Sequence, residues 1–161
     1  MIDEMAIVKK YAAHLPVEVN ALIRELGLTY FEAPMPSENS GRIHKDGSDF
    51  TITVNASEGP QRRRFTAAHE LGHYLLHRDL LPDGAHLDRL FNAQGYEEAN
   101  DGIRPHHEVQ ANQFAANLLM PATFLRTHYD PAADNYKELA RNCAVSSRAM
   151  QVRLKALGLR G

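Results

Sequence analysis

The sequence predicts an α+β fold: a small three-stranded sheet packed on a helical bundle, followed by a C-terminal tail that resembles a helix-turn-helix. Three observations lead to this class. Residues 50–55, FTITVN, alternate apolar and polar side chains with the period of a strand. Residues 61–77 repeat apolar side chains with the 3.6-residue period of a helix. The chain has 161 residues, which is enough for one main core.

The other elements follow from apolar spacing and from the positions of proline and glycine. Gly27 ends a helix as a left-handed residue, and Pro105 and Pro121 each open one. Between residues 78 and 104 the pattern permits only a short helix near 87–91. The remaining expected elements are strands at 28–33 and 42–45 and helices at 2–14, 17–26, 105–120, 121–128, 136–143 and 146–157.

Charge and composition exclude several classes of protein. The chain has 18 Lys and Arg against 20 Asp and Glu, so its net charge of −2 is not that of a strongly basic nucleic-acid binder. No apolar run approaches the roughly 20 residues of a membrane span, and the charged N-terminus is not typical of a signal peptide. The single cysteine, Cys143, cannot form an internal disulfide, so we expect a cytoplasmic protein.

The motif His69-Glu70-Leu71-Gly72-His73 lies inside the strongest helix. Residues four apart share a helix face, so both imidazoles can reach one zinc ion. Glu70 is then placed to accept a proton from the water that such an ion activates. The competing interpretation is a structural histidine pair that matches the motif by chance, but a chain of this composition is expected to contain such a match only about 0.03 times.

A catalytic zinc requires a third protein ligand and one open position. Glu108 fits best, because it heads a helix whose same face carries the small residues Ala111 and Ala115. The competing interpretation is an ordinary acid at a helix N-terminus, stabilised by the helix dipole. The other candidates for this ligand are Glu97, Glu98, Asp101, His106 and His107.

Further polar residues are candidates for supporting roles. Asn112, one turn after Glu108, is placed to hold a ligand histidine through its other ring nitrogen. His77 continues the histidine face of the helix but lies too far along it to ligate easily, so it either packs nearby or lies at the surface. The candidate donors to an oxyanion are Tyr96, His106 and His107.

Two segments resemble the motifs of the ImmA/IrrE family of zinc metallopeptidases. Residues 64–77, RFTAAHELGHYLLH, are similar to its active-site helix, and residues 108–121, EVQANQFAANLLMP, to its second motif. The resemblance spans roughly 17–128, and the C-terminal part is similar to the helical tail of many members. It implies one zinc ion per chain in a gluzincin-like site, held by His69, His73 and Glu108, with Glu70 as general base.

The resemblance also implies a function. Members of the family are cytoplasmic proteases that cut DNA-binding repressors, so we expect a zinc endopeptidase whose partner is a helix-turn-helix repressor, with no membrane. No oligomeric state is predicted. The alternative is a non-catalytic, partner-binding regulator, an anti-repressor or a toxin–antitoxin component, with a structural zinc site. Glu70 argues against it, because a structural site needs no base.

Two further surface features carry less specific signals. If the strand at 50–55 lies at a sheet edge, its residues Thr51, Thr53 and Asn55 would line a site where a peptide adds by backbone hydrogen bonds; an ordinary half-buried strand is the competing interpretation. The run Arg62-Arg63-Arg64 favours a solvated charged face over contact with an acidic substrate.

The apolar spacing of the C-terminal region is typical of a helix-turn-helix. Asp130-Pro131 is the best linker, so we expect a metallopeptidase domain at 1–130 and a helical extension at 131–161 packed on it. The net charge argues against direct DNA binding and favours a helical pair that packs on the domain or grips the substrate. The cations available for such contacts are Arg141, Arg148, Arg153 and Lys155.

Overall fold

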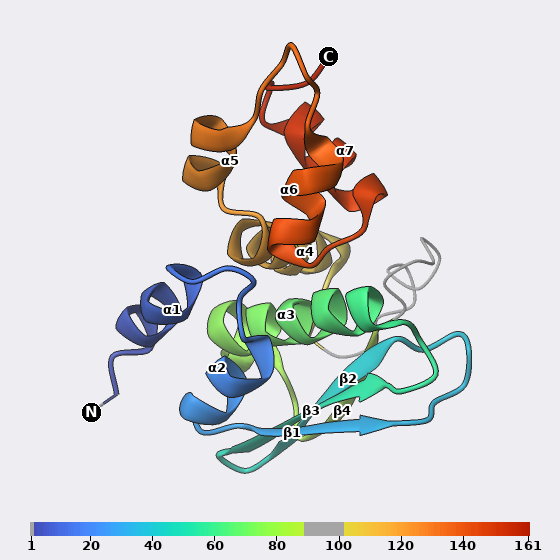
Figure 1. The fold of residues 1–161 in the computed structure, drawn as a ribbon. Helices are drawn as coiled ribbons and strands as arrows, with labels where there is room; N and C mark the ends of the chain where they lie inside the picture. Colours follow the sequence, from blue (N-terminus) through green and yellow to red (C-terminus); the bar gives the residue numbers. More distant parts are fainter. Residues whose placement is uncertain (1, 89–101) are drawn as a thin grey trace.

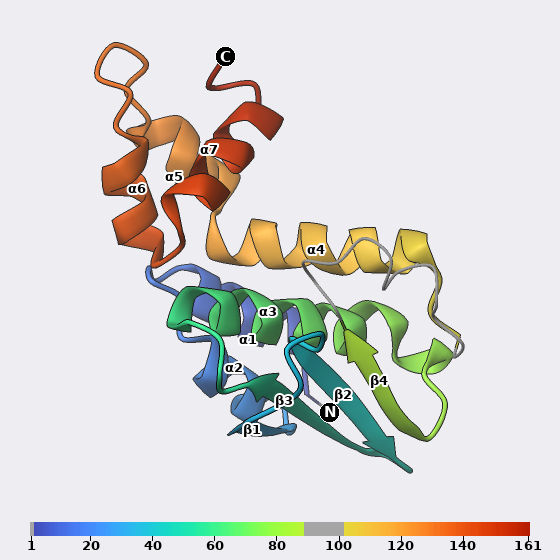
Figure 2. The same ribbon diagram turned by 90° about the vertical axis from the view of Figure 1, so that its right-hand side faces the viewer.

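A computed structural model describes residues 2–88 and 102–161 (Figure 1). The described elements are α1 (Glu4–Ala12), α2 (Val19–Glu25), β1 (Thr29–Ala33), β2 (Gly41–Asp46), β3 (Asp49–Asn55), α3 (Pro60–His77), the 3₁₀ turn η1 (Arg78–Leu80), β4 (Gly84–Asp88), α4 (Pro105–Leu119), α5 (Ala122–His128), α6 (Tyr136–Cys143) and α7 (Ser147–Ala156). α3 lies between the sheet and α4, and α5, α6 and α7 lie beyond α4 (Figures 1 and 2). The α+β class is therefore confirmed.

The sheet has four strands in the described residues, in the order β1-β3-β2-β4, so the expected number of three is wrong. β1 runs parallel to β3, while β2 is antiparallel to both β3 and β4. The additional strand, β4, covers part of the region where only a short helix was considered. In this strand the polar residue His86 is buried and the apolar residue Leu87 is 50% exposed. This is the reverse of the usual burial pattern, so the alternation of apolar residues in the sequence does not indicate a strand here.

β3 is an interior strand, which overturns the expectation of a free edge at residues 50–55. Thr51 and Thr53 pair with β1 on one side and with β2 on the other. Asn55 is also buried, and its amide nitrogen donates to the carbonyls of Met35 at 3.2 Å and Asn39 at 2.9 Å. These three residues therefore hold the sheet and the adjoining loop together. Among the described residues, the edges of the sheet are β1 and β4.

α3 and α4 approach each other closely at a glycine. A Cβ added at Gly72 would lie 3.3 Å from the Cα atom of Ala111 and 3.1 Å from a ring carbon of Phe114. Only small residues permit this separation of the two backbones. The contact brings the first turn of α4, with Glu108, over the middle of α3.

The arginines that open α3 bind backbone carbonyls, so the expectation of a solvated face is wrong for two of the three. Arg63 donates to the Glu58 carbonyl at 2.8 Å. Arg64 donates to the carbonyls of Val17 at 2.8 Å, Cys143 at 3.3 Å and Ala144 at 3.2 Å. Arg64 therefore ties the turn between α6 and α7 to α3.

The C-terminal helices share the core of the rest of the chain. Leu139, Met150 and Leu154 are buried in the same hydrophobic cluster as Ile52 and Leu71. The domain boundary near residue 130 stays a prediction. Within the described ranges, no helix is both long enough and apolar enough to cross a membrane.

We expect Gly72→Val to lower the free energy of unfolding by about 1–3 kcal/mol, because its methyl groups cannot enter the contact with Ala111 and Phe114. Urea denaturation followed by circular dichroism measures the change. Leu76→Val is the control, since it places the same side chain in the same helix at a position that is 55% exposed. Its effect should stay below about 0.7 kcal/mol. Equal losses in the two variants would contradict the close contact.

We also expect Arg64→Met to expose the Cys143 thiol. This thiol is fully buried, and burial raises its pKa to about 11, so it should react slowly with a disulfide reagent at pH 8. Loss of the hydrogen bonds that hold the turn should raise the reaction rate about tenfold or more. Arg141→Met, on the exposed side of α6, is the control. Unchanged reactivity in Arg64→Met would show that Arg64 does not hold the turn.

Candidate metal centre

Three buried side chains from α3 and α4 converge on one point. His69 Nε2 lies 2.9 Å and His73 Nε2 lies 2.7 Å from Oε1 of Glu108. Candidate ligand atoms of the three residues all lie within 4.8 Å of one another, and the three side chains are at most 3% exposed. Two imidazole nitrogens and a carboxylate oxygen form a donor set that suits zinc. These residues could hold a metal ion.

The hydrogen bond to His69 gives a physical reason to expect that ion. His69 Nδ1 lies 2.7 Å from Oδ1 of Asn112. Because an amide oxygen only accepts, Nδ1 carries the hydrogen and Nε2 of the neutral ring carries a lone pair. That lone pair faces an oxygen of Glu108, which also offers only lone pairs when it is ionised. Two acceptors at 2.9 Å require a cation or a proton between them.

His73 is oriented in the same way by a chain of two residues. His77 Nε2 donates to Oε1 of Gln110 at 2.8 Å, so Nδ1 of His77 accepts from Nδ1 of His73 at 3.0 Å. Burial lowers the pKa of His77, which favours the neutral ring that this arrangement needs. Nε2 of His73 is therefore also a lone-pair donor towards Glu108. His77 lies behind His73 and does not join the three converging residues.

His86 contacts the same centre, and the sequence analysis did not find it. From β4, its Nε2 lies 3.0 Å from Oε2 of Glu108, and the residue is 4% exposed. The contact occupies the carboxylate oxygen that does not face His69 and His73. No motif spacing connects His86 to α3. The available signal was a polar residue in a short segment after a proline and a glycine, which is a weak one.

Glu70 lies on the side of α3 that faces the sheet. It is fully buried, and a Cβ built on Gly41 of β2 would lie 3.4 Å from its Oε2. The adjacent candidate ligand, His69, contacts Glu108 of α4. Glu70 therefore packs towards the sheet, while the two histidines of the motif pack towards α4.

The other predicted site residues lie apart from this cluster or outside the described residues. The ring of His107 lies 4.8 Å from that of His77, and its Nδ1 accepts from the backbone of Arg104 at 2.9 Å. Burial lowers the pKa of His107, whereas His106 is exposed and contacts the His107 ring. The residues outside the described ranges are Tyr96, Glu97, Glu98 and Asp101.

Comparisons with known proteins point to metalloproteases. Two relatives are named radiation response metalloprotease IrrE. The one from Deinococcus deserti is 33% identical over 142 residues, which is 85% of this chain and 47% of the relative. The one from Deinococcus radiodurans is 32% identical over 99 residues, which is 60% of this chain and 28% of the relative. The chain therefore spans half or less of the length of these relatives.

A solved structure shares the fold. It is a Mycobacterium tuberculosis transcriptional regulator, with a TM-score of 0.60 and 19% identity, over 94% of this chain and 46% of that one. Residues 23–155 also match the peptidase M78 family, which is described as the IrrE N-terminal-like domain. The resemblance carried by the two motifs is thereby confirmed, and the chain belongs to the IrrE N-terminal-like domain family of M78 peptidases.

Proposed function

We propose that the protein is a cytoplasmic zinc endopeptidase that cleaves a DNA-binding transcriptional repressor. The observation that carries the proposal is the convergence of His69 Nε2, His73 Nε2 and Glu108 Oε1, with the buried Glu70 next to His69 in the chain. The names of the two Deinococcus relatives support a metalloprotease. The proposal that the substrate is a repressor rests on the resemblance to the ImmA/IrrE family.

Each residue has a distinct part in the proposed reaction. His69, His73 and Glu108 would hold the ion, and Asn112, His77 and His86 would fix their orientations. When bound there, zinc would polarise the carbonyl of the scissile peptide bond and make a water molecule more acidic. Glu70 would accept a proton from the attacking water and transfer it to the nitrogen of the leaving amine.

Because β3 is an interior strand, a substrate segment cannot add to it, and the site of strand addition that we propose is the edge strand β4. β4 pairs only with β2 among the described residues, and it carries His86, which contacts Glu108. A substrate segment that pairs with the outer side of β4 would therefore lie beside the proposed ligands.

Replacing Glu70 by glutamine should separate metal binding from turnover. We expect the Glu70→Gln variant to retain about one zinc per chain, because none of the proposed ligands changes. Its cleavage of a candidate helix-turn-helix repressor should fall by about 10²–10⁴-fold, because the amide cannot accept the proton. Elemental mass spectrometry and gel electrophoresis measure the two quantities. Cleavage at the wild-type rate would rule out Glu70 as the base.

Removing the third ligand should remove the metal. We expect Glu108→Ala to weaken zinc binding by about 100-fold or more in a competition titration with a chromophoric chelator. Glu138→Ala is a matched control, because Glu138 is also an acid in the first turn of a helix but is exposed. Equal zinc affinity in wild type and Glu108→Ala would contradict the proposed ligand set.

A further inference from the structure

A second feature, beside the metal centre, is a large groove bordered by three helices. It has a volume of about 1140 Å³ and runs between the start of α3, the outer face of α4 and α7. Apolar side chains from each helix line it, and Val109 of α4 and Val152 of α7 are 50% and 55% exposed. The other apolar lining residues include Phe65, Ala116 and Ala149. Facing apolar side chains on two helices form a surface that a partner can cover.

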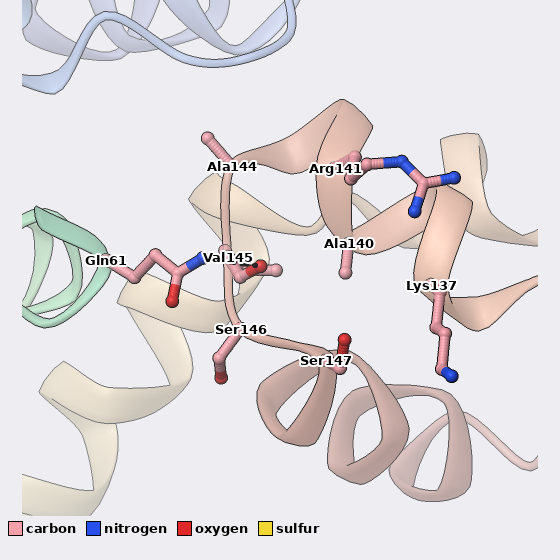
Figure 3. A pocket seen from close by; sticks show the side chains of 8 residues that line it. All are labelled: Gln61, Lys137, Ala140, Arg141, Ala144, Val145, Ser146 and Ser147. Carbon is pink, nitrogen blue, oxygen red and sulfur yellow. Dashed lines mark hydrogen bonds between the residues drawn. The ribbon is translucent and has the colours of Figure 1, made fainter.

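The groove continues into a smaller hollow whose lining includes two cations, Lys137 and Arg141. This hollow, of about 490 Å³, shares Gln61, Val145 and Ser146 with the groove. Figure 3 shows the hollow with Gln61 on one side and with Lys137 and Arg141 of α6 on the other. The residues that line the groove and the hollow include four cations and no aspartate or glutamate. The joint lining therefore combines apolar side chains with positive ones and contains no acid.

One of these cations is held in place by the protein itself. Arg153 donates from Nε to the Met120 carbonyl at 3.0 Å and from Nη2 to Oδ1 of Asn117 at 2.8 Å. Neither acceptor is a carboxylate, and within the described part of the chain no acid pairs with Arg153. A fixed guanidinium without an acidic partner is ready to bind a carboxylate with little further loss of side-chain freedom.

The groove also reaches the metal centre. Asn112 lines it and contacts His69 through Oδ1. Val109, which also lines it, follows Glu108 directly in the sequence. A polypeptide bound in the groove would therefore lie one residue layer from the proposed ligands.

We propose that the groove docks an amphipathic acidic helix of the protein substrate, with its apolar face on α4 and α7 and its carboxylates towards Arg153, Arg141 and Lys137. The inference rests on the proposed function. The volume exceeds the roughly 300–1,000 Å³ of small-molecule pockets. For a helix about 10 Å wide that rises 1.5 Å per residue, it corresponds to about ten residues. The apolar part of the lining offers no contact to the phosphates of a nucleic acid.

The test uses two fluorescein-labelled peptides of about 14 residues, or four helical turns. One has leucines on a single helical face and glutamates elsewhere, and the other has lysines in place of the glutamates. Binding is measured by fluorescence anisotropy with the zinc-loaded Glu70→Gln protein, so that cleavage does not interfere. We expect the acidic peptide to bind at least tenfold more tightly than the basic one.

Matched variants locate the binding surface. Val152→Asp should weaken binding of the acidic peptide about tenfold or more, and Arg141→Glu should weaken it several-fold. Met5→Asp, at a 56% exposed position of α1, and Lys155→Glu, outside both linings, should leave it unchanged. Equal affinity for the two peptides, or full affinity in Val152→Asp, would overturn the proposal.

Other occupants give different results. A DNA duplex that displaces the acidic peptide would assign the surface to nucleic acid, and wild-type dimers that dissociate in Val152→Asp would assign it to a second copy of the chain; both results overturn the proposal. Peptide binding that Val152→Asp abolishes, in a protein that cleaves no repressor, would support the groove and contradict the proposed function. Repressor cleavage by Val152→Asp with an unchanged KM would support the proposed function and contradict docking in the groove.

Discussion

The close packing of α3 on α4 is the constraint on which the site depends. His69 and His73 share a helix face through their spacing alone, but Glu108 reaches them only because Gly72 lets the backbone of Ala111 approach. The sheet supports this arrangement from the other side, where Glu70 is buried next to β2. α3 is thus held between the sheet and α4, with Glu70 next to β2 and the two histidines next to α4. A wider helix separation would leave two histidines without a third partner.

The polar groups around the three converging residues are matched in hydrogen-bonding character. Each histidine has its Nδ1 hydrogen engaged, by Asn112 for one and by His77 for the other, so each presents a lone pair at Nε2. Such an arrangement is electrostatically unfavourable when empty and favourable around a cation. These hydrogen bonds fix the ring orientations that a bound cation would need.

The sequence predicted the helices well because their signals are local. The bounds expected for α3 and α4 lie within one residue of those observed, since apolar spacing marks α3 and Pro105 opens α4. β4 and the role of His86 were not predicted, because the buried residue of that strand is polar and the exposed one is leucine. The interior position of β3 could not be predicted either, because the pairing of a strand depends on parts of the chain that are distant in sequence. The sequence predicts a solvent-exposed Arg64, whereas its partners in the structure are backbone carbonyls distant in sequence, which no sequence pattern indicates.

The separation of the site residues along the chain links folding to metal supply. Glu108 lies 39 residues after His69 and 35 after His73, so the site exists only once α4 has docked on α3. An ion that binds the docked state and not the open one shifts the folding equilibrium by mass action. A cell short of that ion would hold more of the protein in an open, protease-sensitive form. The abundance of the protein would then follow the ion's availability without any change in transcription.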